Sequence, residues 1–431
     1  MLATRPAPVP SKNVRREILL MNPPSRSALG ILSWRDCGVN ARGRAGRAFL
    51  YFPIAASIHC VNMIRKMVWG LALAASIVTA FGEHTVATRE FFYVGGKYTG
   101  PPGKEVMAGQ MYVEVLRPQR MKRRVPLVFF HGNWQTSTNW LGTPDGREGW
   151  ADYFLGQGYV VYLVDQPARG RSAWHASANG PLGGLSIADT EQRFTASEVN
   201  GNWPQAKKHT QWPGAGPKKG RKGDPIFDRF YATQVESLTS AVETETLIQA
   251  AGSALLDKIG PAILITHSQS GSFGWLLADN RPRAVKGIVA IEPAGPPFRN
   301  AVVNQDKNRA WGLADIPLTY DPPAEVAREL APVREKAADG PGLTACWKQP
   351  EPARRLPHLK GIPILVVTSE SSNHAVYDHC TSKYLTQAGV ANTFWRLEDQ
   401  GIHGNGHMMM LEKNNLEVAA LLEKWIAAHT R

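Results

Sequence analysis

From about residue 85 the chain alternates between short apolar runs and longer stretches of mixed polarity. Short runs rich in Val, Ile and aromatic residues are typical of strands, and an uninterrupted apolar run favours a strand buried on both faces of a parallel sheet. We predict strands at Phe91–Val94, Gln110–Leu116, Val125–Phe130, Tyr159–Val164, Ile263–Thr266, Val285–Ile291, Ile364–Thr368 and Thr393–Leu397. A Gly/Pro turn separates the first two, which therefore predict an antiparallel opening pair.

Helical stretches lie between these runs. We predict helices at Trp150–Gly156, Gln234–Ala251, Gly271–Asp279 and Leu411–Ala428. Alternating strands and helices indicate an α/β fold with a mostly parallel, eight-stranded sheet flanked by helices. Ligands of such sheets bind at the carboxyl ends of the strands, so the chemistry is expected there.

Two long segments interrupt this alternation, at about residues 172–231 and 295–356. A connection of that length inside a compact domain is usually functional, so we expect both to form a cap over the site. In the first segment, Trp174, Trp203 and Trp212 either line an apolar pocket or anchor an irregular loop to the core. The sequence favours neither interpretation over the other.

The net charge of +13 does not indicate a nucleic-acid partner, because most of it lies in one place. Residues 1–66 contain 11 basic and two acidic residues, which leaves the remaining chain close to neutral. We therefore interpret residues 1–62 as a basic leader that is disordered or not translated. The other basic run, PKKGRKG at 217–223, is short and lacks interleaved aromatic residues, as expected of a solvated loop.

Residues 63–82 resemble a secretory signal peptide. Arg65 and Lys66 precede an uncharged apolar run, Met67–Gly82, that contains small residues near its end. The run is shorter than the ~20 residues that a membrane-spanning helix needs, so no stable membrane insertion is expected. A buried apolar helix and a cleaved organellar leader are the alternatives. We predict a secreted or periplasmic protein whose folded domain spans residues 85–430.

Cys346 and Cys380 are the cysteines of the predicted domain. In an exported protein they form one disulfide or remain as two buried thiols. Neither cysteine has the spacing of a zinc site. We therefore expect no metal and no cofactor.

A candidate nucleophile lies where the run Ile263–Thr266 turns sharply into a predicted helix. The segment Thr266-His-Ser-Gln-Ser-Gly271 places small residues two positions before and after Ser268. This is the pattern of a nucleophile elbow, in which small neighbours permit a strained turn that exposes the serine hydroxyl. Ser270 is the alternative nucleophile, but it would fall inside the first helical turn.

A serine of ordinary pKa needs a base, and the base needs an orienting carboxylate. Because the base of an elbow enzyme follows the last strand, His403 and His407 are the candidates. Glycines on both sides of Asn405 suit a tight loop that presents His407 at the start of the final helix, so we prefer His407.

The candidate acids are Glu292 and Glu370. The usual position, after the strand at 364–368, contains Glu370 but no aspartate. Glu292 ends the preceding strand, and a buried carboxylate there requires a partner, which a nearby histidine would provide. We therefore prefer Glu292, with an ion pair to an arginine as its structural alternative.

The oxyanion hole requires two backbone N–H groups, one from the residue after the nucleophile and one from a loop after an earlier strand. Gln269 follows Ser268. His131-Gly-Asn133 follows the run Val125–Phe130, so Asn133 is the second expected donor. We interpret His131 as structural.

At these residues the chain resembles α/β-hydrolases and, more narrowly, a group of bacterial secreted or periplasmic serine esterases. The matching motifs are HGNWQTSTNW (131–140), VDQPARGRS (164–172), THSQSG (266–271), IEPAG (291–295) and GIHGNGHMMMLEKNN (401–415). The resemblance covers about residues 88–430 and implies the triad Ser268, Glu292 and His407. The chain departs from the group at Asn133, where cysteine can occur.

We therefore predict a cofactor-free serine hydrolase that cleaves a small-molecule carboxylic ester through an acyl-enzyme. A lactonase or amidase with the same triad is the alternative enzyme. A catalytically silent hydrolase fold used for binding is the alternative from another class of protein. Neither a nucleic-acid partner nor a metal is expected.

Overall fold

The computed structural model describes residues 86–302, 306 and 308–430. The predicted leader and the signal-like segment 63–82 lie outside these residues. Within the described residues, no helix has both the length and the apolar character needed to cross a bilayer.

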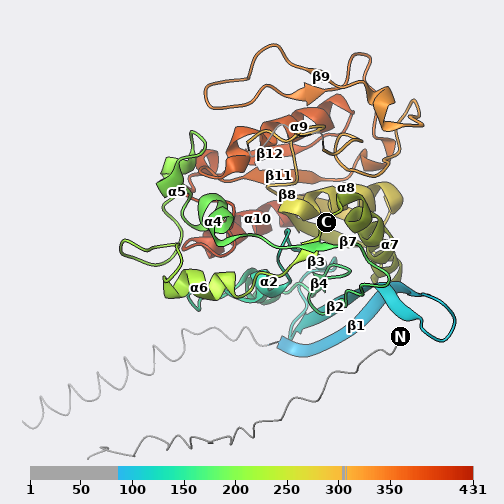
Figure 1. Ribbon diagram of the computed structural model, residues 1–431, viewed down its shortest axis with the longest axis horizontal. Coiled ribbons are helices and arrows are strands. Elements are labelled where there is room, and N and C mark those ends of the chain that lie inside the picture. The colour runs from blue at the N-terminus through green and yellow to red at the C-terminus, as the bar shows by residue number, and fades with distance from the viewer. Residues whose placement is uncertain (1–85, 303–305, 307, 431) are drawn as a thin grey trace, which may run out of the picture. The chain divides into compact units, whose positions relative to one another are not determined.

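One eight-stranded sheet organises the domain (Figure 1). In spatial order its strands are β1 (Val86–Thr99), β2 (Val106–Pro118), β4 (Val161–Asp165), β3 (Leu127–Phe130), β7 (Ala262–His267), β8 (Val285–Ile291), β11 (Ile364–Thr368) and β12 (Thr393–Arg396). β2 pairs antiparallel with both β1 and β4, and all other neighbours are parallel. The predicted fold class and the antiparallel opening pair are confirmed.

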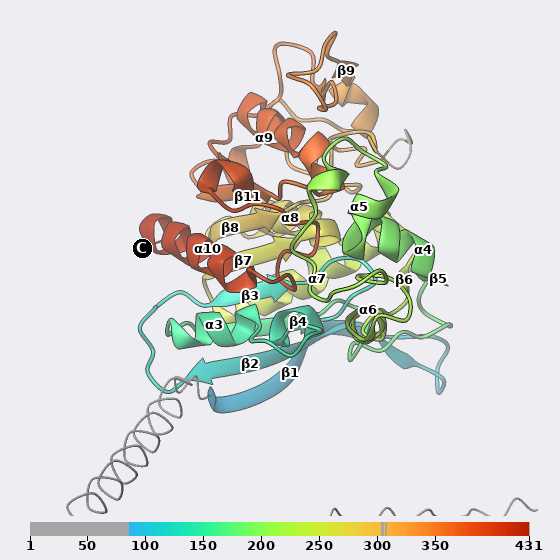
Figure 2. The same ribbon diagram turned by 90° about the vertical axis from the view of Figure 1, so that its left-hand side faces the viewer.

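Helices cover both faces of the sheet (Figure 2). One face is covered by α7 (Ala241–Ile259), α8 (Gly271–Asn280) and α9 (Asp378–Gln387), and the other by α3 (Trp150–Gly156) and α10 (Asn415–His429). Successive side chains of a strand point to opposite faces, so β7 sends Leu264 into one apolar cluster and Ile263 and Ile265 into the other. This is why the central strands consist of unbroken apolar runs.

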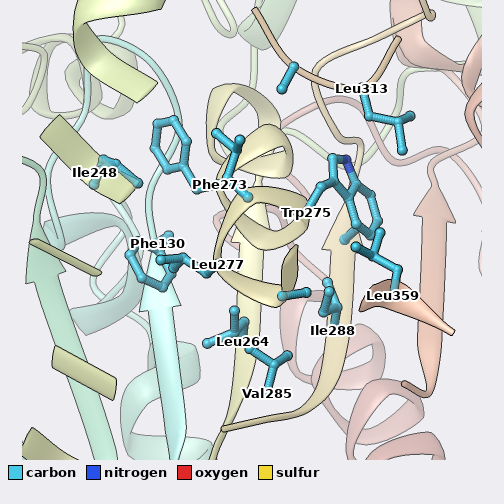
Figure 3. Close-up of a cluster of buried hydrophobic side chains, with 14 of the residues drawn as sticks. Phe130, Ile248, Leu264, Phe273, Trp275, Leu277, Val285, Ile288, Leu313 and Leu359 are labelled. Carbon is cyan, nitrogen blue, oxygen red and sulfur yellow. The ribbon is translucent and has the colours of Figure 1, made fainter. Parts of the chain in front are cut away.

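The first cluster packs α8 onto the central strands. Figure 3 shows Phe273 and Leu277 of α8 close to Phe130 of β3, Leu264 of β7 and Ile288 of β8. All five side chains are at most 1% exposed. Burial of this kind is worth roughly 1.5–3 kcal/mol for each large apolar side chain, so α8 is held firmly at the carboxyl end of β7.

The predicted helix Gln234–Ala251 is wrong at both ends, because α7 runs from Ala241 to Ile259. Ser240 caps it, since its side chain accepts a hydrogen bond from the backbone N–H of Glu243. Residues Ser237–Leu238 instead form β6, which pairs with β5 (Leu182–Gly183).

The two long segments contain only short elements. In the first are β5, α4 (Ile187–Thr190), a π-helical turn (Glu191–Thr195), α5 (Ser197–Asn200), a 3₁₀ turn (Ala206–Lys208) and α6 (Pro225–Tyr231). In the second are a 3₁₀ turn (Ala327–Leu330), β9 (Val333–Arg334) and β10 (Trp347–Lys348). Elsewhere lie α2 (Thr138–Leu141) and 3₁₀ turns at Ser268–Ser270, Pro357–Leu359, Asn373–Val376 and Leu397–Gln400.

A disulfide joins Cys346 to Cys380. It links the second long segment to α9, and both cysteines are buried. Of the two alternatives left open by the sequence, the structure shows the bridge.

Candidate active site

Ser268 lies at the sharp turn between β7 and α8, with φ of +56°. A residue other than glycine adopts this left-handed conformation only when its surroundings impose it. Ser270 is buried and helps impose it, because its hydroxyl donates to the carbonyl of Phe130 and accepts from the backbone N–H of His267. A Cβ atom added at Gly271 would lie 2.4 Å from Cβ of Pro293, which explains the small residue there.

Glu292 follows β8 and is fully buried, with φ of +43°. Its Oε1 accepts from the backbone N–H of Ser369 at 2.8 Å and from the Ser369 hydroxyl. Its Oε2 accepts from the Ser372 hydroxyl at 2.7 Å. Burial on its own raises the pKa of Glu292, but the hydrogen bonds from His407 and Ser369, and the attraction of the carboxylate to His407 when that imidazole is protonated, outweigh burial and hold the pKa well below its usual value. The carboxylate is therefore ionised.

His407 and Glu292 form a hydrogen-bonded pair. Nδ1 of His407 lies 2.5 Å from Oε2 of Glu292, across 115 positions of sequence. The imidazole is 3% exposed and stacks against the rings of Phe194 and His374, with centroids 5.1 and 4.7 Å away. Burial lowers the pKa of His407, and the hydrogen bond and charge of Glu292 oppose this effect only in part. The lowered pKa favours the neutral imidazole.

The loop that carries His407 is fixed by a buried carboxylate. Oε1 of Glu412 accepts from the backbone N–H of Gly406 at 2.9 Å, and Oε2 accepts from the Asn405 amide at 2.8 Å. Glu412 also binds Nε2 of His209 at 2.8 Å, while Nδ1 of His209 binds Glu198 at 3.0 Å. This Glu198–His209–Glu412 bridge connects the first long segment to the histidine loop.

His403 and Glu370, the alternative base and acid, lie elsewhere and pair with each other. Nδ1 of His403 is 3.3 Å from Oε2 of Glu370, and the imidazole is exposed. Glu370 also accepts from Lys208 at 3.0 Å and from the backbone N–H of Gly404 at 2.9 Å. Neither residue lines the pocket that contains Ser268.

Ser268 and His407 face a common pocket of about 390 Å³. Aromatic groups in its wall include Trp134, Phe194 and Tyr377. The described residues show no hydrogen bond between Ser268 and His407. Hydrogen bonds between a nucleophile and its base are often long before substrate binds, so the position of both side chains in one pocket is what relates Ser268 to His407 here.

Charged groups also line this pocket. Arg193 comes from the first long segment, Arg309 from the second, and Glu245 from α7. Burial raises the pKa of the Glu245 carboxyl to about 7. The pocket wall is therefore mixed in polarity rather than a purely apolar acyl tunnel.

None of the three tryptophans of the first segment lines the pocket. Trp203 and Trp212 are buried, and Trp203 donates its indole N–H to the carbonyl of Ser371. Trp174 is 38% exposed. The interpretation of these side chains as a pocket lining is wrong; Trp203 and Trp212 anchor the segment, and Phe194 contributes its aromatic surface to the site.

Gly132 and Asn133 approach the elbow from the end of β3. A Cβ atom added at Gly132 would lie 3.2 Å from Cβ of Ser268 and 3.0 Å from Nδ1 of His267, so a larger residue here would require these neighbours to shift. Asn133 and Gln269 both line the pocket. Within the described residues, the backbone N–H groups of Asn133 and Gln269 are not used in any hydrogen bond.

A second imidazole–carboxylate pair lies beside His407 and was not predicted. Nδ1 of His374 is 3.0 Å from Oδ1 of Asp378, whose Oδ2 accepts from the Thr368 hydroxyl at 2.6 Å. The i, i+4 spacing of His374 and Asp378 just after a strand is a signal that sequence reasoning missed. His374, Glu292 and His407 bring potential metal ligands within 4.8 Å of one another. A metal there would have to break the Glu292–His407 hydrogen bond, so we assign none.

Comparisons with known proteins agree with this architecture. Residues 127–421 match the model of the alpha/beta hydrolase family. The chain is 48% identical over 337 residues to a protein described as probable secreted lipase phiG, from Fungal sp. (strain ATCC 74256), covering 78% of this chain and 88% of that one. A solved structure, a novel bacterial esterase, is 25% identical, covers 81% of this chain and 98% of its own, and has a TM-score of 0.54.

The chain therefore belongs to the α/β-hydrolase family. Within that family it is a carboxylic ester hydrolase.

Proposed function

We propose that the chain is a serine esterase in which Ser268 is the nucleophile, His407 the general base and Glu292 the orienting acid. One observation carries the proposal: a serine held at positive φ shares a pocket with a buried His407–Glu292 pair. The motif pattern that resembles bacterial secreted esterases supports the same three residues.

In the proposed first step, His407 removes the proton of the Ser268 hydroxyl as its oxygen attacks the ester carbonyl. The ionised Glu292 carboxylate holds the proton on Nδ1 of His407, which leaves Nε2 free to act as the base. It also stabilises the imidazolium that forms. His407 then returns the proton to the leaving alcohol, and an acyl-enzyme remains on Ser268.

In the second step, water attacks the acyl-enzyme with His407 again as base, and the acid product leaves. The free N–H groups of Asn133 and Gln269 are the proposed oxyanion hole, because both residues line the pocket beside Ser268. Fixed donors of this kind stabilise the charge of the tetrahedral intermediate without having to reorganise.

We infer that the protein is exported, with residues 63–82 as the signal segment. The buried Cys346–Cys380 disulfide supports this, because disulfides persist mainly in oxidising compartments. N-terminal sequencing of the protein secreted by its natural host tests the inference. We expect the mature chain to begin after the signal segment, near residue 83, and a mature start before Met63 would contradict the inference.

The activity is tested with p-nitrophenyl esters, lactones and anilides, using the wild-type protein and Ser268→Ala. We expect esters to be hydrolysed and the variant to lose at least about 10³-fold in kcat. Preferential turnover of lactones or anilides would instead identify the lactonase or amidase alternative. Absence of turnover on every substrate would favour a silent scaffold used for binding.

A further inference from the structure

Arg169 occupies an unusual position beneath the proposed oxyanion hole. It follows β4 and is only 3% exposed. Its Nη1 donates to the carbonyl oxygen of Gly132 at 3.1 Å and to the side-chain oxygen of Gln269 at 3.2 Å. Nη2 makes a longer contact of 3.5 Å with the side-chain oxygen of Asn133. One side chain therefore touches both sides of the hole.

No carboxylate forms an ion pair with this guanidinium within the described residues. The charge of Asp165 opposes the effect of burial on Arg169, but the Asp165 carboxylate binds Arg171 at 2.8 Å, and Nε of Arg169 has no hydrogen-bond partner among the described residues. Burial lowers the pKa of Arg169 to about 9, so it stays protonated at neutral pH. A buried charge that donates hydrogen bonds only to neutral oxygens destabilises the fold. Ionisable groups in such unfavourable environments are concentrated at functional sites.

The loop geometry presents the side chain at this place. Ala168 and Gly170, on either side of Arg169, have φ of +59° and +53°. A Cβ atom at Gly170 would lie 2.7 Å from Oδ2 of Asp165, so the turn is closely packed. Arg169 does not line the pocket, which argues against direct contact with a substrate carboxylate.

The hydrogen bond from Arg169 to the carbonyl oxygen of Gly132 acts on the peptide group that supplies one of the proposed oxyanion-hole donors. The Gly132 carbonyl and the Asn133 N–H belong to one peptide unit, so a cationic donor on the oxygen polarises the N–H toward a stronger donor. The bond to Gln269 fixes the residue that supplies the other N–H. The positive charge also lies behind the site where negative charge develops.

We propose that Arg169 is a positioning residue of the oxyanion hole, which ties its two halves together and places a buried positive charge behind it. The proposal rests on the serine esterase function proposed above.

The test is the variant Arg169→Met. Its kcat is expressed per active site, and the active sites are counted by their stoichiometric reaction with a fluorophosphonate. Removal of a direct oxyanion donor lowers kcat about 10²- to 10³-fold, so an indirect contributor is expected to lower it about 10- to 100-fold. We expect KM to change by less than about threefold. Affinity for a boronic acid transition-state analogue should fall in parallel with kcat/KM.

Arg171→Gln is the matched control, because Arg171 comes from the same loop and binds Asp165 and Glu114 rather than the hole. We expect a lower Tm in this variant and unchanged kcat per active site. If Arg169→Met fails to fold, Arg169→Lys replaces it, with an expected fall in kcat of about 3- to 10-fold.

Unchanged kcat per titrated site in the folded Arg169 variant would overturn the proposal. The proposal would also be overturned if the variant lost affinity for the boronic acid and for the substrate by the same factor, because Arg169 would then act on the ground state as much as on the transition state. If only the Arg169 proposal is wrong, the fluorophosphonate still labels Ser268 in the wild-type protein. If the serine esterase proposal is wrong, the wild-type protein is not labelled at Ser268.

Discussion

Glu292 accepts a hydrogen bond from His407 at 2.5 Å, although Glu292 follows β8 and His407 follows β12, which lies two strands further along the sheet. The proposed acid follows β8, one strand before β11, and Ser369 and Ser372 after β11 donate hydrogen bonds to it. In our proposal the segment after β11 therefore orients the acid instead of supplying it.

Glu292→Gln tests this assignment. The amide keeps the shape but carries no charge to stabilise the imidazolium, so we expect kcat to fall by about 10²- to 10⁴-fold with little change in KM. Glu370→Gln is the control and should stay within about twofold of the wild-type protein, because Glu370 lies outside the pocket. A larger loss in Glu370→Gln than in Glu292→Gln would make Glu370 the acid.

The pH dependence of kcat/KM reports the pKa of the base in the free enzyme. Because burial lowers the pKa of His407, we expect the midpoint of the acid limb to lie below 6.5. The base is active when neutral, so a lower pKa extends activity to lower pH. A midpoint above 6.5, measured with a substrate that has no ionisable group, would contradict this account.

His374 contributes to this midpoint. Asp378 raises the pKa of His374 in spite of burial, and the resulting positive charge beside His407 lowers the pKa of the base. In the double variant His374→Phe/Asp378→Asn we expect the acid limb to move to higher pH while the flat ring still supports His407. An unchanged midpoint would show that His374 acts by packing alone.

The Glu198–His209–Glu412 bridge predicts a pH-dependent stability. Burial lowers the pKa of His209, but the two carboxylates outweigh it and raise the pKa to about 9. Because the pKa of His209 is higher in the folded than in the unfolded protein, its protonation stabilises the folded state. This stabilisation is fully present below the unfolded-state pKa of about 6.5 and is lost as pH rises through the folded-state pKa of about 9. It amounts to roughly 3 kcal/mol.

Urea unfolding of the wild-type protein and His209→Gln between pH 6 and 10 measures this. We expect the difference in the free energy of unfolding to be largest at pH 6, to shrink as pH rises from about 6.5 to about 9, and to be smallest at pH 10. The exposed histidine variant, His403→Gln, should differ from the wild-type protein by less than about 0.5 kcal/mol. A difference for His209→Gln that is constant with pH would contradict the charged bridge.

The strands could be predicted from sequence because buried parallel strands are continuous apolar runs. All eight are confirmed, with ends that differ by a few residues. The start of α7 was placed too early because the pattern before Ser240 does not distinguish a helix from the short strand β6. The N-cap serine followed by Glu243 was the signal that marks the true start.

The residues of the proposed site could be predicted where they lie at the ends of strands, and could not be predicted where they depend on contacts between distant segments. Ser268, Glu292 and His407 each follow or precede a recognisable element, so their placement could be argued from order along the chain. Phe194 and the serines that bind Glu292 come from segments whose position no local pattern encodes. Their contacts appear only when the chain is folded.

The most direct measurement is covalent labelling of the wild-type protein with a fluorophosphonate, followed by mass spectrometry of its peptides. The account predicts one adduct, on Ser268, at a rate that falls sharply in His407→Ala and Glu292→Gln, and no adduct in Ser268→Ala. An adduct on Ser270 or another serine, or labelling of Ser268→Ala at the wild-type rate, would contradict it.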